Sequence, residues 1–397
     1  MTRTFDLVLF GATGFAGRLT AEYLAQHAPA GARIALAGRN GPKLEQLRAE
    51  LPASAKAWPV LIADAGDAAA LAKLAAQATA VCTTVGPYAK YGLPLVEACA
   101  KAGTHYCDLT GETQFIRDSI DRADATAKAS GARIVHTCGF DSIPSDLGVL
   151  ALHEALGTLL RATYVVVKMK GGVSGGTIAS MLNMLDEVKV NPSRRTLLSD
   201  PYALSPNREQ EPKLGGEGDL MGLRYDEFVD QWVAPFVMAA INTRVVRRSN
   251  ALLDYAYGRQ FRYAEVMGMK SLFNAALFTG GLGLLMGSLV FGPTRKLVES
   301  RLPRPGEGPD EQTRKTGFLK VHIVGEGESG VKKTLEITGQ GDPGYQLTAL
   351  ILGQAALCLA FDDAKLPRRA GVLTPATAMG RTLIDRLVAA GMTFTVS

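Results

Sequence analysis

Three glycines, Gly11, Gly14 and Gly17, recur at intervals of three residues in the stretch FGATGFAGRL. They lie where an apolar run typical of a buried strand gives way to a helical pattern. At such a junction the first glycine permits a tight turn, the second lets the backbone approach a pyrophosphate, and the third lets the helix pack closely on the strand. The N–H groups that begin the helix then face the phosphates. We predict a dinucleotide-binding loop here; the alternative is a tight turn without a ligand.

The end of the second expected strand indicates which dinucleotide binds. An NAD site usually carries Asp or Glu at this point to accept from the ribose hydroxyls, but this chain reads LAGRN, without an acid. The guanidinium of Arg39 can pair with a 2′-phosphate, and Lys43 lies one helical turn further on. NADP is therefore favoured over NAD, the alternative being that Arg39 is only a solvated surface residue.

Two further strand ends add residues to this site. Asp64 either accepts from the adenine amino group or caps the next helix, and the residues alone do not separate these roles. The turn TVGPY closes the fourth strand where the nicotinamide half should lie. The residues that we expect to bind the cofactor are Gly11, Ala12, Thr13, Gly14, Phe15, Gly17, Gly38, Arg39, Asn40, Lys43, Asp64, Val85, Gly86, Pro87 and Tyr88.

Three side chains near strand ends are candidates for catalysis. Tyr88 could donate to an oxyanion, although a hydrogen-bonded tyrosine covering the cofactor is favoured. Asp141 and Ser142, in GFDSIP, could take part in proton transfer, although a cap of the following helix is favoured for Asp141. Tyr164 and Lys168 have the Tyr-x-x-x-Lys spacing of short-chain dehydrogenases, but the three valines between them indicate a strand and no such role. The histidines form no cluster suited to a metal, and we predict none.

The elements that must position these residues alternate between strand-like and helix-like patterns over residues 1–150. Near-continuous apolar strands between helices predict a Rossmann-type, doubly wound α/β domain with a parallel sheet. Residues 151–344 instead predict an inserted α+β domain for the substrate or for dimerisation, with a long loop or lid over 191–218. It should contain an antiparallel sheet, with one strand within 257–269 and a pair joined by a turn over 317–342. Helices within 345–397 should pack back on the first domain and complete it.

Composition narrows the class of protein. The net charge of +5 is mild and its acidic and basic residues are interspersed, which gives no reason to expect nucleic acid. The five cysteines form no CxxC pair and are expected to be buried thiols in a reducing compartment. No signal peptide precedes the first strand, so we expect a cytoplasmic protein. Arg244, Arg247 and Arg248 share one side of an expected helix, either as a solvated face, which is favoured, or as a patch for a phosphate or anionic lipid.

The segment 271–294 contains no charged residue and is long enough to cross a bilayer. A span is disfavoured because basic residues flank both ends and because later strands would then lie across the membrane from the first domain. A buried core helix is a second alternative, although four glycines weaken it. We favour, by a small margin, an apolar helix or bent helical pair that docks on the inner face of the plasma membrane and guides a lipid chain.

Longer motifs carry a family resemblance. The blocks GATGFAG, LAGRN, TVGPYAKYGLPLVEACAKAGTHYCDLTGE, GFDSIPSDLG and GVLTPATAMG together resemble the saccharopine dehydrogenase-like oxidoreductases. They are most similar to the branch that includes the bacterial trans-acting enoyl reductases. The resemblance implies a Rossmann domain with an inserted α+β domain, a nicotinamide cofactor, and hydride delivery to an unsaturated acyl chain in complex lipid synthesis.

We therefore expect an NADP-dependent enoyl reductase whose apolar acyl substrate is linked to a lipid or a carrier protein, in glycolipid or polyketide synthesis. Saccharopine enzymes proper are a poorer match, because a substrate with three carboxylates calls for several converging Arg or Lys residues. Two alternatives remain open: a membrane-associated protein that keeps a nucleotide site without turnover, and a reductase of a C=O or C=N bond. A homodimer is compatible with either.

Overall fold

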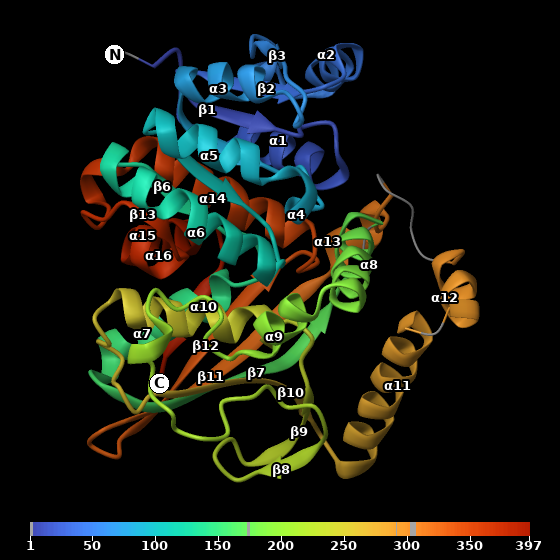
Figure 1. Ribbon diagram of the computed structural model, residues 1–397, viewed down its shortest axis with the longest axis vertical. Coiled ribbons are helices and arrows are strands. Elements are labelled where there is room, and N and C mark those ends of the chain that lie inside the picture. Colours follow the sequence, from blue (N-terminus) through green and yellow to red (C-terminus); the bar gives the residue numbers. More distant parts are fainter. Residues whose placement is uncertain (1–2, 173–174, 291, 302–306) are drawn as a thin grey trace.

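Two seven-stranded sheets, A and B, organise the chain, and they form the upper and lower bodies in Figure 1. The computed structural model describes residues 3–172, 175–290, 292–301 and 307–397. Sheet A begins at the N-terminus and sheet B contains the strand next to the C-terminus. Residues 371–373 pair in sheet A and residues 393–396 pair in sheet B, so both bodies contain part of the C-terminal stretch.

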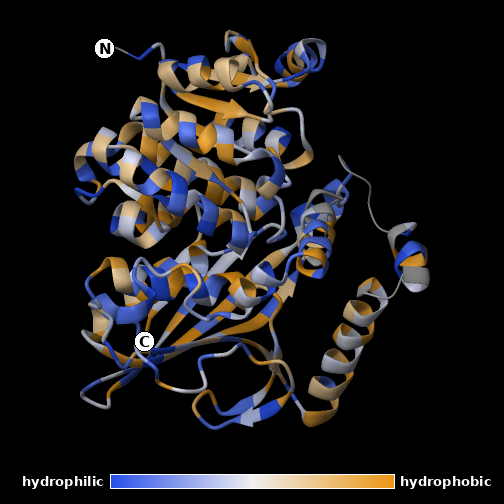
Figure 2. Ribbon diagram, viewed as in Figure 1, coloured by the Kyte–Doolittle hydropathy of each residue, from blue (hydrophilic) through white to orange (hydrophobic). Residues whose placement is uncertain are grey.

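Sheet A is parallel throughout and has the strand order β13-β6-β5-β4-β1-β2-β3. Its strands are β1 (Phe5–Phe10), β2 (Ile34–Gly38), β3 (Val60–Ile62), β4 (Ala78–Thr83), β5 (His105–Asp108), β6 (Arg133–Val135) and β13 (Gly371–Leu373). Consecutive residues of β1, Leu7 to Leu9, have no exposed surface, so both faces of the sheet are covered. Figure 2 shows this strand as one of the most hydrophobic parts of the upper body.

Helices form a layer on each face of sheet A. Helices α1 and α14 contact each other in one layer, and α3, α5 and α6 form the other. These helices, together with α2 and α4 of the same body, are α1 (Phe15–His27), α2 (Gly41–Glu50), α3 (Ala68–Gln77), α4 (Tyr88–Tyr91), α5 (Leu93–Ala102), α6 (Thr113–Ser130) and α14 (Gln346–Phe361). The expected Rossmann-type, doubly wound arrangement is confirmed. The strand order reverses at β1, which has β4 on one side and β2 on the other, and open α/β sheets bind ligands at the carboxyl ends of the strands at such a switch point.

Sheet B is mixed and has the order β14-β12-β11-β7-β10-β9-β8. Its strands are β7 (Leu159–Lys170), β8 (Arg224–Asp226), β9 (Gln231–Pro235), β10 (Arg262–Met269), β11 (Phe318–Gly327), β12 (Lys332–Gln340) and β14 (Thr393–Val396). The antiparallel pair β11–β12 is confirmed. Strands β7 and β10 are parallel, however, because the chain between them includes helices and can make the long crossover that a parallel pair needs.

The remaining elements lie around these sheets. They are α7 (Ile143–Leu156), α8 (Gly175–Val190), α9 (Pro192–Ser199), α10 (Ala239–Leu252), α11 (Leu272–Val290), α12 (Gly292–Glu299), α13 (Glu311–Thr316), α15 (Pro375–Ala378) and α16 (Gly380–Ala389), with 3-10 turns at Ala53–Ala55, Arg208–Gln210 and Asp363–Lys365. Helices α7 and α10 contact each other and pack on sheet B. The assignment of all of 345–397 to the first domain is wrong in one element, because β14 pairs with β12 in sheet B.

The three arginines of α10 correct two sequence interpretations. Arg244, Arg247 and Arg248 are all at least nine-tenths buried, so they form neither a solvated face nor an anion patch. Arg244 pairs with Asp219, Arg247 donates to the carbonyls of Pro201, Glu217 and Tyr263, and Arg248 donates to those of Leu204 and Val372. Three of these acceptors, Pro201, Leu204 and Glu217, belong to the stretch expected to be a loop or lid. That stretch contains α9 and is held against α10, which explains why α10 carries so many cations on one buried side.

Replacing Arg248 should destabilise the fold. In Arg248→Ala the carbonyls of Leu204 and Val372 lose their donors inside the protein, at 2.6 Å each. We expect the free energy of unfolding to fall by about 3 kcal/mol, the usual cost of removing one partner from a buried charged network. Urea denaturation followed by circular dichroism measures this. Arg381→Ala removes only the exposed ion pairs with Asp385 of α16 and Glu154 of α7; it is the control and should stay within about 1 kcal/mol. An equal effect of both variants would contradict the role given to Arg248.

Candidate active site

The glycine loop between β1 and α1 has the geometry expected of a phosphate cradle. Gly11 has a φ of +87°, which L side chains rarely adopt. A Cβ on Gly17 would lie only 2.2 Å from the carbonyl oxygen of Gly11, so the close approach of α1 to the turn requires glycine there. The Thr84 hydroxyl, just after β4, donates to the same oxygen over 3.1 Å. The loop after β1 is thus hydrogen-bonded to the end of the neighbouring strand β4.

Gly14 meets a different requirement. It precedes α1, and a Cβ there would approach only the Gly11 carbonyl oxygen, at 3.4 Å. As the N-cap residue, Gly14 has no side chain that could cap α1, which leaves the N–H groups of the first turn suited to an anion. The exposed Gly14 backbone leaves room for that anion, and these features fit a dinucleotide pyrophosphate.

The residues predicted for the cofactor lie together at one edge of sheet A. They follow β4, β1, β2 and β3, which are consecutive in the sheet, and all sit at the carboxyl ends of these strands. Arg39 is exposed directly after β2, and among the described residues no partner is recorded for its guanidinium. Asn40 caps α2 by accepting from the Lys43 N–H over 3.0 Å, and the Lys43 side chain in the first turn of α2 is exposed. This pair of cations is suited to a 2′-phosphate.

Asp64 is an exposed residue two positions after β3. One carboxyl oxygen accepts from the Gly66 N–H over 2.8 Å. Asp67, and not Asp64, caps α3 by accepting from Ala69 and Ala70. The capping alternative for Asp64 is therefore wrong, and its contact with adenine stays a prediction.

The turn after β4 is held by a buried carboxylate. Glu112 accepts from the backbone N–H groups of Tyr88 and Ala89 over 2.9 and 2.8 Å. Burial raises the pKa of Glu112 above its ordinary value, while these two hydrogen bonds oppose the rise. Gly86 is exposed in this turn, and a Cβ there would lie 3.8 Å from the Ser180 hydroxyl of α8. Helix α8 therefore lies over the place predicted for the nicotinamide half.

Tyr88 is not placed to act on a substrate. Its side chain is buried, its hydroxyl donates to the Thr83 carbonyl over 3.2 Å, and its ring packs near Phe115. Burial also raises the pKa of the phenol well above its ordinary value. The structure corrects the catalytic role considered for Tyr88 and leaves it as a buried support of the turn.

Asp108, at the end of β5, is a buried hub that the sequence interpretation missed. It accepts from the Tyr106 hydroxyl over 2.8 Å and from the Thr110 and Thr137 N–H groups over 3.1 Å, and it lies 2.7 Å from Nδ1 of His136. Nε2 of His136 in turn lies 2.8 Å from the Ser119 hydroxyl. Asp108, His136 and Ser119 thus have the order of a nucleophilic triad, but they are almost completely buried and serve to join β5, β6 and α6. The sequence did contain a sign of this cluster, because Asp108 ends one expected strand and His136 follows the next, and neighbouring parallel strands bring their carboxyl ends together.

Asp141 is the remaining candidate for proton transfer. It is half-buried between β6 and α7, and burial raises the pKa of its carboxyl to about 7, with the charge of Asp108 adding to the shift. A Cβ on Gly139 would lie 2.6 Å from this carboxyl, so glycine leaves room for it. Asp141 does not cap α7, because Ser142 occupies the cap position. The Ser142 hydroxyl is buried and donates to Asn242 over 2.8 Å, so the structure argues against a catalytic role for Ser142.

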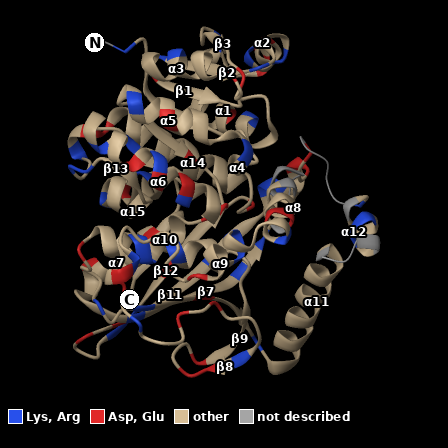
Figure 3. Ribbon diagram, in the orientation of Figure 1, with Lys and Arg blue, Asp and Glu red and all other residues tan. Residues whose placement is uncertain are grey.

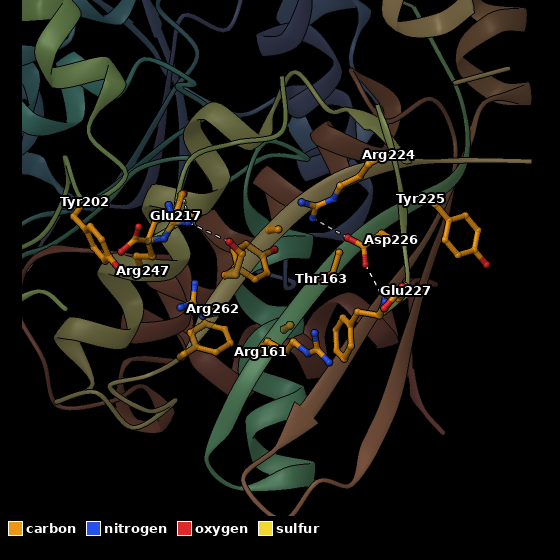
Figure 4. Close-up of a pocket in the computed structure, with 16 residues that line it drawn as sticks. Arg161, Thr163, Tyr202, Glu217, Arg224, Tyr225, Asp226, Glu227, Arg247 and Arg262 are labelled. Carbon is orange, nitrogen blue, oxygen red and sulfur yellow. Dashed lines mark hydrogen bonds and ion pairs between the residues drawn. The ribbon is translucent and has the colours of Figure 1, made fainter. Parts of the chain in front are cut away.

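Other chemical features lie elsewhere. Tyr164 is buried in β7 against Phe236, so the Tyr-x-x-x-Lys spacing belongs to a strand as predicted. Within the described residues no group of three or more potential metal ligands is found. A cavity of about 380 Å³ is lined by residues of sheet B and its loops and by none of the glycine loop (Figure 4). Each of its arginines already binds a carboxylate or backbone carbonyls; they are Arg161, Arg224, Arg247 and Arg262.

Comparison with known proteins agrees with this geometry. A family model for the saccharopine dehydrogenase NADP-binding domain matches residues 7–135. A Mycobacterium tuberculosis H37Rv protein, provisionally named a trans-acting enoyl reductase, is 49% identical over 98% of this chain and 97% of its own length. A trans-acting enoyl reductase from Mycobacterium ulcerans is 42% identical, with the same coverage. Saccharopine dehydrogenase from Saccharomyces cerevisiae shares the fold, with a TM-score of 0.51, 12% identity and coverage of 98% and 99%. The predicted fold class and NADP as cofactor are confirmed.

Two glycine substitutions should separate cofactor binding from folding. Gly14→Val places a branched side chain where the pyrophosphate would lie and should abolish the thermal shift caused by NADPH without lowering the melting temperature of the free protein. Gly17→Ala should destabilise the free protein by roughly 1–3 kcal/mol, the range for overpacking, because its Cβ collides with the Gly11 carbonyl. Thermal unfolding with and without NADPH measures both effects. A retained NADPH shift in Gly14→Val would show that this loop is not the cradle.

Arg39 should set the preference between the two nicotinamide cofactors. Arg39→Ala removes an exposed guanidinium beside the end of β2 and should weaken NADPH binding by roughly 1.5–3 kcal/mol, the range for a hydrogen bond to a charged group. NADH, which has no 2′-phosphate, is the internal control and should bind almost unchanged. Isothermal titration with each cofactor tests this, and an equal loss for both would assign Arg39 a structural role instead.

Proposed function

Because this chain belongs to the trans-acting enoyl reductase branch of the saccharopine dehydrogenase-like family, we propose that it reduces the carbon–carbon double bond of an α,β-unsaturated acyl group with NADPH. The observation that carries this proposal is identity of 42–49% to relatives of that name over 98% of the chain. The phosphate cradle and the exposed Arg39 support it, since the parts needed for NADP are intact. The alternatives of a protein without turnover, and of a C=O or C=N reductase, are not favoured.

In such a reaction the protein's own residues need only position the cofactor and supply a proton. Bound NADPH supplies the hydride, and enzymes that use such a cofactor need few further reactive groups. The glycine loop would hold the pyrophosphate, and the turn held by Glu112 lies where the nicotinamide half is predicted, at the same edge of sheet A. Asp141 holds a proton near neutral pH and is the candidate to deliver it to the α-carbon.

The substrate is an acyl chain presented by a lipid or a carrier protein. Support comes from the surroundings of Gly139, two positions before Asp141, where the side chains of Thr348 and Leu109 are uncharged neighbours. A substrate with several carboxylates would need converging cations there. We also propose that the protein acts in the cytoplasm, since its five cysteines are buried free thiols.

An assay with matched thioesters tests the proposed activity. Purified protein is incubated with NADPH and with enoyl, β-keto and saturated acyl thioesters of one chain length, and NADPH oxidation and product mass are followed. Reduction of the enoyl compound alone is expected. Reduction of the keto compound alone would replace the proposal with a C=O reductase, and inactivity towards enoyl groups on both coenzyme A and a carrier protein would favour a protein without turnover.

Asp141 should give the reaction its pH dependence. The carboxyl holds its proton below a pKa of about 7, so kcat/KM should fall as the pH rises through that value. Asp141→Asn should lower kcat roughly 10²–10⁴-fold, the range for a lost general acid, and remove this falling limb. NADPH affinity is the control and should not change. A variant with an unaltered pH profile would exclude Asp141 as the proton donor.

A further inference from the structure

Helix α11 is an apolar element with little protein around it. It has 19 residues, none of them charged, and it stands beside the lower body with only one part against β9 and β10 (Figures 1 and 3). Among the described residues it is the one helix long and apolar enough to cross a membrane, and only 11% of that stretch is buried. The exposed large side chains are Leu272, Phe273, Leu277, Phe278, Leu284 and Leu285. The core-helix alternative for 271–294 is therefore wrong for the described residues of α11.

The exposed residues form a broad face. At about 100° per residue, Phe273, Leu277 and Leu284 share one side of α11, and they are 74%, 67% and 78% exposed. The opposite side carries the buried Ala275 and Leu289. Both sides are apolar, and a helix that is hydrophobic all round needs an apolar environment rather than a water-facing surface.

The connections of α11 argue against a crossing. Strand β10 precedes the helix and β11 follows it, and both belong to sheet B. Beyond the helix, Arg295 of α12 forms a two-pronged ion pair with Asp186 of α8, one contact of which is 2.8 Å long. A perpendicular span would separate these partners by the thickness of a bilayer. The helix must therefore meet an apolar partner from one side.

Charge indicates which partner this is. No acidic residue occurs between positions 266 and 298, and the exposed Lys270 and Lys296 lie close to the two ends of the helix, followed by Arg301. A second copy of this chain would bring the same cations together, whereas anionic lipid headgroups would complement them. We propose that α11 inserts lengthwise into the surface of an anionic lipid bilayer, with Phe273, Leu277 and Leu284 in the acyl-chain region.

The same helix is connected to the candidate active site. Asp186, the partner of Arg295, lies on α8, whose Ser180 lies over Gly86 and whose Glu187 accepts from Gln114 over 3.1 Å. This route joins the lipid-facing helix to the turn beside the nicotinamide position. Resting on the proposed function, the bilayer surface is then the place from which a lipid-linked acyl chain enters.

Vesicle flotation tests the insertion. Full-length protein is mixed with vesicles of phosphatidylcholine, with or without phosphatidylglycerol, and should float only with the anionic ones. The double variant Leu277→Asp/Leu284→Asp should bind these vesicles roughly a hundredfold more weakly, since it removes two leucines from the apolar phase. Met221→Asp/Val388→Asp, which changes exposed apolar residues on other elements, is the matched control and should bind as the wild type does. Lys270→Glu/Lys296→Glu should lose the preference for anionic lipid.

Two further measurements make each outcome decisive. Thermal unfolding should show that the leucine variant is folded, because both leucines are exposed; reduction of a short, soluble enoyl thioester should persist in it. Failure of the wild-type protein to float overturns the proposal. If, in that case, sedimentation shows the wild type as a dimer and the leucine variant as a monomer, a second copy of the chain covers α11 instead. Equal binding by the leucine variant also overturns it. Absence of any NADPH oxidation by wild type concerns the proposed function alone, because flotation does not depend on turnover.

Discussion

Two buried carboxylates, Asp108 and Glu112, hold the loops after β4, β5 and β6 at the edge of sheet A where the nicotinamide half is predicted to lie. Asp108 joins the ends of β5 and β6 through Tyr106, His136 and Thr137, and Glu112 holds the turn after β4 by its backbone N–H groups. Taking a carboxylate out of water is unfavourable unless its oxygens are hydrogen-bonded, and here the loops themselves supply the donors. The loops can therefore adopt this arrangement only together, which makes one rigid edge from segments far apart in the chain.

The second body is fixed to the first by another set of buried polar groups. The arginines of α10 bind carbonyls of the stretch after α9 and of β13, and Asp146 of α7 accepts from Ser249 of α10 and from the Ala376 N–H of α15. Burial raises the pKa of Asp146 to about 7, so the protonated form is favoured more than in water. These contacts fasten β13 and α15, near the end of the chain, to α10 and α7. The two sheets share one interface, and the site lies beside it.

The chemistry of the site is sparse for the same reason. Tyr88 and Ser142 are candidates from the sequence, and His136 and Ser119 have a triad-like order in the structure, yet all four are buried and help to build the loops. Among the three catalytic candidates from the sequence, Asp141 remains half-buried, and burial raises the pKa of its carboxyl to about 7. A hydride-transfer enzyme can work with so few groups because its cofactor carries the reactive atom. The unusual feature of the molecule is instead α11, which leaves a large apolar surface uncovered by protein.

Local patterns in the sequence determined the parallel sheet, the glycine loop and the cofactor side of the site. These depend on short-range requirements: Gly11 and Gly17 on the space within one turn, and Arg39 on its position directly after β2. Only the tertiary structure decided which polar side chains are free. Whether Arg247 and Arg248 face solvent or carbonyls depends on residues more than forty positions away. Whether Tyr88 faces a substrate or Thr83, and whether α11 is core or exposed, depends on how the surrounding elements pack. Spacing along one element says which residues share a face, but what covers that face is set by the rest of the fold.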